Sequence, residues 1–111
     1  MQPVEINAGA WYLRALRADE LIDDRPALAD LGETDDDYVT RCSAQWLSDV
    51  RYSWAVCEPT TGELLAEITL DTGTARLATR ARPGHDDAAS IAADAVRRFA
   101  GGALGMTLPA H

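Results

Sequence analysis

The chain has 111 residues, and its ten arginines, absent lysines and 18 acidic residues give a formal net charge of −8. This length suits one domain that can bury a hydrophobic core without help from a metal or a disulfide. Nucleic-acid backbones are bound by lysine and arginine, so the excess of carboxylates argues against nucleic acid as a partner.

Signals for membranes, secretion and metals are also missing from the sequence. No apolar run reaches the ~18 residues that a membrane-spanning helix needs. The first nine residues carry Glu5 and no cationic segment, unlike a secretory signal. Two cysteines, Cys42 and Cys57, are too few for a disulfide framework or a zinc site. We therefore expect a cytoplasmic protein with no membrane partner and no metal.

In chain order, the sequence first predicts an arm and then a single domain. Residues 1–9 show no periodicity and are expected to form a flexible arm, whereas residues 10–111 form the domain. Residues 11–16 alternate enough to predict a first strand, with Trp11 and Leu13 on one side.

Helical segments follow. Residues 19–32 favour a helix that is interrupted at Pro26, because proline inside a helix loses a hydrogen bond and clashes with the preceding turn. Asp24 is expected to cap the second part. The next segment, capped by Thr34 or Asp35, is amphipathic, since its apolar positions follow helical spacing. Those positions are Val39, Cys42, Ser43, Trp46 and Val50.

The middle of the chain predicts β-structure. Residues 52–71 form a hairpin, because alternating segments flank turn residues at 58–63. Trp54 of this hairpin and Trp46 are expected at the centre of the core. Residues 74–82 alternate apolar and cationic positions, as in a strand with one buried face. The arginines of that strand could grip an anion, but pairing with Glu67 or blunting of a sheet edge is the favoured interpretation.

A last helix completes the pattern. Asp86 or Asp87 is expected to cap it, and Gly101-Gly102 to end it. Residues 106–108 are a candidate for a short closing strand. The buried positions of the helix are predicted to be Ile91, Ala92, Ala95, Val96 and Phe99. The elements together predict an α+β fold, a mainly antiparallel sheet of four to five strands with helices on its faces.

This order of elements resembles the first half to two-thirds of a GNAT N-acetyltransferase. The likeness rests on residues 11–16 as the opening strand, 52–67 as the central hairpin and 91–100 as the helix after the family's pyrophosphate loop. It covers about residues 10–105. The resemblance implies a GNAT-like partial fold and points to acetyl-CoA as the cofactor of the family.

In the family, glycines and a cation of this loop face the pyrophosphate of acetyl-CoA. Here the loop falls at residues 86–90, where two carboxylates replace the cation. A carboxylate about 5 Å from a phosphate charge costs on the order of 3 kcal/mol before solvent screening. We therefore expect no cofactor, and acetyl-CoA only if the chain is an enzyme. The resemblance implies as cofactor-binding positions Thr79, Ala81, Asp87, Ala88, Ala89 and Ser90.

The resemblance also implies catalytic candidates. In many GNAT enzymes a carboxylate on the third strand helps to deprotonate the acceptor amine, and the corresponding residues here are Glu67 and Asp71. Carboxylates of a strand that merely face solvent are the alternative. The tyrosine that serves the family as general acid has no counterpart among Tyr12, Tyr38 and Tyr52.

Two functions remain open on this basis. One is a non-catalytic GNAT-like domain that serves as a binding or regulatory module. The other is a minimal acetyl-CoA-dependent N-acetyltransferase that is completed by dimerisation or by a partner chain. A gene remnant with little function of its own is a third interpretation. In each case the strand at 74–82 would be a sheet edge, so we expect a homodimer or a partner protein that covers it.

Overall fold

The computed structural model describes residues 1–108, in which five strands form one sheet and three helices flank it. The strands are β1 (Ile6–Ala8), β2 (Trp11–Arg14), β3 (Arg51–Cys57), β4 (Leu64–Asp71) and β5 (Arg76–Ala81), and the helices are α1 (Arg25–Asp30), α2 (Tyr38–Ser48) and α3 (Asp86–Ala103). All neighbouring strands are antiparallel, in the order β1-β2-β3-β4-β5. The predicted α+β class, with a mainly antiparallel sheet of four to five strands, is thus confirmed, and the sheet has five strands.

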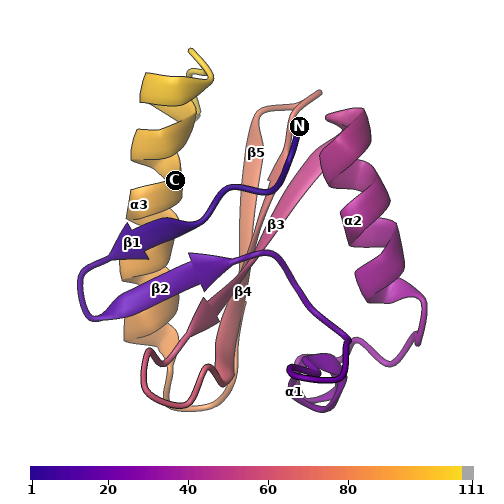
Figure 1. Cartoon of the computed structure of the whole chain (residues 1–111). Helices are drawn as coiled ribbons and strands as arrows, with labels where there is room; N and C mark the ends of the chain where they lie inside the picture. The colour runs from indigo at the N-terminus through magenta and orange to yellow at the C-terminus, as the bar shows by residue number, and fades with distance from the viewer. Residues whose placement is uncertain (109–111) are drawn as a thin grey trace.

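The helices lie on opposite faces of the sheet. Helix α3 packs across one face, and α1 and α2 lie on the other (Figure 1). Trp54, Ile68 and Val96 belong to the core cluster that α3 covers. Leu28 and Cys42 belong to a second cluster, under α1 and α2. Strand alternation explains this division, because neighbouring residues of β3 and β4 point to opposite faces.

An aromatic cluster joins α2 to the sheet and to α3. The ring of Trp46 stacks on Tyr52 at 4.5 Å between centroids and meets Trp54 edge-on at 5.0 Å. Trp54 in turn contacts Phe99 at 5.9 Å. Both indole N–H groups donate to backbone carbonyl oxygens. Trp46 and Trp54 are 1% and 0% exposed, so their predicted place in the core is confirmed.

A buried ion pair ties β2 to the segment before α1. Arg14 donates to both carboxylate oxygens of Asp24 at 2.8 Å, and also to the carbonyl oxygen of Gly62. Asp24 accepts the amide hydrogen of Arg17 at 2.7 Å. These hydrogen bonds replace the water that the two charges lose on burial. Asp24 precedes α1 as expected, but its carboxylate makes no cap hydrogen bond because Arg14 and Arg17 occupy it.

Part of the predicted arm belongs to the sheet. Residues 6–8 form β1 and pair with β2, where Ile6 lies opposite Leu13. Gly9 makes the turn with a φ of +62°, a conformation that glycine adopts without strain. A strand of three residues is too short for its alternation to be recognised in the sequence.

The helix starts differ most from the sequence prediction. Residues 19–22 form no helix, because the carboxylate of Asp19 accepts the amide hydrogens of Leu21 and Ile22 and holds a turn instead. The cap positions of α2 and α3 are Asp37 and His85, and neither makes a side-chain cap hydrogen bond. The expected caps were therefore wrong, namely Thr34 or Asp35 for α2 and Asp86 or Asp87 for α3.

The chain end and three helix-face positions also differ. Helix α3 continues through Gly101 and Gly102 to Ala103. Residues 106–108 form no strand, although Met106 donates its amide hydrogen to Ala100 and packs against the core. The positions that were predicted to be buried but are exposed are Ser43, Val50 and Ile91. Within residues 1–108, no helix is long and apolar enough to cross a membrane.

Candidate functional site

Glu67 lies in β4, on the sheet face that carries α1 and α2, and is 2% exposed. Its Oε2 accepts the hydroxyl hydrogen of Tyr38. Its Oε1 accepts two hydrogen bonds from Arg80, at 2.8 Å from Nε and 2.6 Å from Nη2. Arg80 stands opposite Glu67 in the β4–β5 register and also reaches Glu33 at 3.2 Å. We call these four residues the Glu67 cluster, and its ion pair confirms the predicted pairing of a β5 arginine with Glu67.

Hydrogen bonds and opposite charges within the cluster hold its side chains together. Burial and the hydrogen bond to Glu67 raise the pKa of Tyr38 above its ordinary value, so its hydroxyl stays a donor. Burial is the largest single influence on Arg80 and opposes its charge, but the hydrogen bond to Glu67, the attraction of that carboxylate and the hydrogen bond to Glu33 act together against it, so that the pKa of Arg80 is raised. Three donors thus fill three of the roughly four acceptor sites of the Glu67 carboxylate. A substrate amine would have to displace Tyr38 or Arg80 to be deprotonated there.

Asp71 is not close to Glu67. The two lie on the same face of β4, but four steps of about 3.3 Å along the strand separate them by roughly 13 Å. Asp71 accepts the amide hydrogen of Thr74 at 2.9 Å, and this backbone hydrogen bond lowers the pKa of its carboxyl group. Its part in the structure is to hold the turn between β4 and β5. The two predicted catalytic carboxylates therefore do not form one site.

A groove of about 350 Å³ runs between the outer edge of β5 and the first turns of α3. We call it the β5–α3 groove, and its lining residues are Thr79, Ala81, Asp86, Ala89, Ser90, Ala93, Asp94 and Arg97. Of the predicted cofactor positions, it brings together Thr79, Ala81, Ala89 and Ser90. Asp87 and Ala88 lie outside its lining.

This groove does not fit the pyrophosphate of acetyl-CoA. Asp86 and Asp87 occupy the first turn of α3, where their carboxylates already use the favourable field of the helix N-terminus. Asp94 lines the groove and pairs with Arg97 at 2.8 Å. Ala88 is 1% exposed, and its side chain belongs to the core cluster that α3 covers. A phosphate here would meet the carboxylates of Asp86 and Asp94, and the arginine of the lining, Arg97, is already paired with Asp94.

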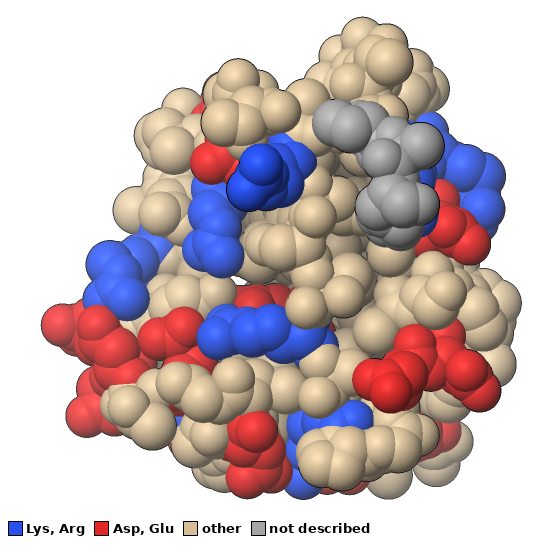
Figure 2. All heavy atoms as spheres, turned by 180° about the vertical axis from the view of Figure 1, so that it is seen from behind, with Lys and Arg blue, Asp and Glu red and all other residues tan. Residues whose placement is uncertain are grey.

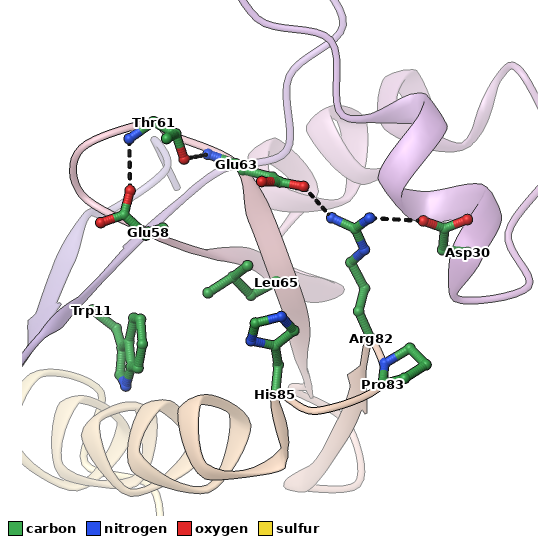
Figure 3. Close-up of a pocket in the computed structure, with 9 residues that line it drawn as sticks. All are labelled: Trp11, Asp30, Glu58, Thr61, Glu63, Leu65, Arg82, Pro83 and His85. Atoms are coloured by element: carbon green, nitrogen blue, oxygen red, sulfur yellow. Dashed lines mark hydrogen bonds and ion pairs between the residues drawn. The ribbon is translucent and has the colours of Figure 1, made fainter.

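A larger cavity, of about 760 Å³, lies where the start of β2, the β3–β4 turn and the β5–α3 loop meet (Figure 3). We call it the end cavity. Arg82 forms part of its wall and bridges Asp30 of α1, at 2.9 Å, to Glu63 of the turn. This cavity could not be predicted from the sequence, because its walls come from four separate segments. The turn at 58–63, with a glutamate at each end, was the one available signal.

Charges are mixed over the surface. On the face in Figure 2, arginine side chains lie among carboxylates and form no continuous patch. Pairs such as Arg41 with Asp35 and Arg97 with Asp94 contribute to this mixture. Such a face lacks the basic stripe with which proteins bind phosphate backbones. In the part of the chain that the structure describes, no three His, Cys, Asp or Glu side chains gather as a metal site would require.

Comparison with known proteins adds evidence on the fold. No family model matches the sequence, and no curated protein matches it. A solved structure from Vibrio cholerae, described as a ribosomal-protein-serine acetyltransferase, matches with a TM-score of 0.77 at 17% sequence identity. The match covers 96% of this chain and 72% of that chain. Identity this low establishes the fold but not the activity. The chain therefore has a GNAT-like fold and spans 72% of the length of that structure.

Proposed function

We propose that this chain is a non-catalytic GNAT-like domain of the cytoplasm that serves as a binding or regulatory module. The Glu67 cluster carries the proposal. Glu67 is the carboxylate that the fold would offer as a base, yet Arg80 and Tyr38 hold it in a buried network. Displacing either partner would leave a buried charge with fewer hydrogen bonds, which is costly.

The β5–α3 groove supports the same conclusion. A GNAT reaction needs acetyl-CoA, but Asp86 and Asp94 line this groove, and Asp87 adds a second carboxylate to the first turn of α3. The domain would then keep the GNAT-like fold without the acetyl-transfer activity.

Calorimetric titration with acetyl-CoA tests this proposal. We expect no saturable heat at micromolar concentrations, whereas a dissociation constant in the low micromolar range would overturn the proposal. Asp87→Arg should strengthen whatever weak binding exists, because it places a cation at the helix N-terminus. Asp36→Arg makes the same charge change at an exposed site outside the groove, and it should leave binding unchanged.

The second candidate is a minimal N-acetyltransferase that is completed by dimerisation or by a partner chain. The observation in its favour is that Thr79, Ala81 and Ser90 do line a groove along the edge of β5. It requires acetyl-CoA binding and transfer of the acetyl group to a primary amine. Release of free CoA thiol in the presence of amines would support this candidate against the first.

The partner of the domain is also a proposal. β5 is the outermost strand on its side of the sheet, and an exposed strand edge readily pairs with another chain. We infer that a second copy of this chain, or a different protein, covers this edge.

A further inference from the structure

The end cavity contains a slot with apolar walls. In Figure 3, Leu65 lies above the imidazole of His85, and the indole of Trp11 stands to the left of both. Leu65 is 5% exposed and Trp11 is half-buried, and both present apolar surface to the cavity. The volume of about 760 Å³ falls within the roughly 300–1,000 Å³ that is usual for small-molecule sites.

The charged residues of this cavity are mostly acidic. Three carboxylates, those of Asp30, Glu58 and Glu63, face one guanidinium, that of Arg82. Arg82 is already engaged by Asp30 and Glu63. The formal charge of these four side chains is −2, so the cavity favours a cation over an anion.

Glu58 is the carboxylate that is available to a ligand. Its Oε2 accepts the amide hydrogen of Thr61 at 2.7 Å, and no residue that the structure describes forms an ion pair with it. Hydrogen bonds from the backbone N–H groups of Thr61 and Thr60 lower the pKa of Glu58, which therefore remains an anion at neutral pH. The turn thus presents a fixed negative charge above the slot (Figure 3).

We propose that the end cavity binds an organic cation, an ammonium or guanidinium group on a short apolar stem, which rests on the binding role proposed above. The stem lies against Trp11 and Leu65, and the charge faces Glu58. Trp is the aromatic residue that attracts cations most strongly, so its indole supports both parts of such a ligand. The cation could belong to a free amine or to a lysine or arginine side chain.

Titration of the isotope-labelled protein, followed by amide and indole NMR signals, tests the proposal. Butylammonium and butylguanidinium should give saturable shifts at Trp11, Thr61 and His85. Butanol has the same stem without the charge, and pentanoate has the opposite charge, so both should give weaker or no saturable shifts. A blocked peptide with a single central arginine distinguishes the two sources, since tighter binding than butylguanidinium indicates a side chain of a partner.

Glu58→Gln is the decisive variant. Glutamine keeps an acceptor for the amide of Thr61, so the turn should fold, but it removes the charge. We expect the dissociation constant for butylammonium to rise by roughly fourfold or more, the effect of one charge at about 5 Å under full aqueous screening. Glu20→Gln makes the same change at an exposed residue outside the cavity and should leave the constant unaltered.

Three results would overturn the inference: no saturable shifts with either cation, equal binding of butanol, or an unchanged dissociation constant in Glu58→Gln. Acetyl-CoA added to the same sample tests the proposed function separately from the cation site. Binding of acetyl-CoA would shift the NMR signals of Thr79 and Ser90, which line the β5–α3 groove.

Discussion

At the residue scale, Glu67 shows how a carboxylate can be kept deep in a small protein. Its burial costs several kcal/mol unless other groups replace the lost water, and Arg80 and Tyr38 provide that replacement. Arg80 and Glu67 each stabilise the charge of the other, but Glu67 depends on its partner more. Arg80 is one-third exposed, with 34% of its side chain reaching solvent, whereas Glu67 has no such alternative.

We predict that Arg80→Met destabilises the fold by about 2–3 kcal/mol at neutral pH, because it leaves Glu67 buried without a cation. Urea unfolding at pH 7 measures this loss. Arg51→Met removes a half-buried arginine without an ion pair to a described residue and should cost less. Equal losses in the two variants would refute the prediction.

The raised pKa values of two tyrosines predict how the stability of the fold changes at alkaline pH. Burial and the hydrogen bond to Asp49 raise the pKa of Tyr52 from 10.0 to about 12. The pKa of Tyr38 is raised by burial and by its hydrogen bond to Glu67. Above pH 10 the unfolded chain loses these protons and the folded chain keeps them, so stability should fall as the pH rises. Urea unfolding between pH 9 and pH 11 measures this slope, which should be shallower in Tyr38→Phe. A flat profile in the native protein would contradict it.

The sequence predicted part of this residue-scale picture. Glu67 was a candidate through the family resemblance, and its pairing with a β5 arginine followed from the cationic face of that strand. Tyr38 was not foreseen, because it is 29 residues away from Glu67. Sequence periodicity reports which face a residue occupies but not which distant side chain meets it there.

At the element scale, the strongly periodic segments were the predictable ones. The hairpin of β3 and β4 and the body of α2 and α3 follow alternation or helical spacing over many residues. Asp24 does occupy the cap position of α1, although Arg14 holds its carboxylate, whereas the expected cap of α2 was wrong because Asp35 accepts the amide hydrogen of Asp37 instead. Such competition among nearby carboxylates depends on three-dimensional contacts.

Substitutions in two elements should differ sharply in their effect on stability. Trp54→Ala removes a fully buried ring and is expected to cost about 3–5 kcal/mol, a large share of the ~5–15 kcal/mol of a domain. Asp87→Ala removes an exposed carboxylate that makes no cap hydrogen bond and should cost less than about 1 kcal/mol. Chemical denaturation of the two variants measures the contrast. If Trp54→Ala retained native stability, the aromatic cluster would not be the core.

At the scale of the whole molecule, the sheet has two unequal edges. β1 has three residues, whereas β5 has six. Arg82 donates its amide hydrogen to Leu65 of β4. Alternate residues of an antiparallel strand point their amides the same way. Leu77, Thr79 and Ala81 therefore direct their N–H groups away from β4, toward the place of a further strand.

We expect this edge to pair two copies of the chain, with β5 antiparallel to its equivalent around Thr79. Sedimentation at tens of micromolar should then show a dimer, with the amides of β5 protected from hydrogen exchange. Thr79→Pro removes one outward N–H and no bond to β4, so it should yield a folded monomer. Thr79→Ser keeps the N–H and should remain dimeric. A native protein that sediments as a monomer, with fast exchange at Leu77, Thr79 and Ala81, would show that no second copy covers the edge.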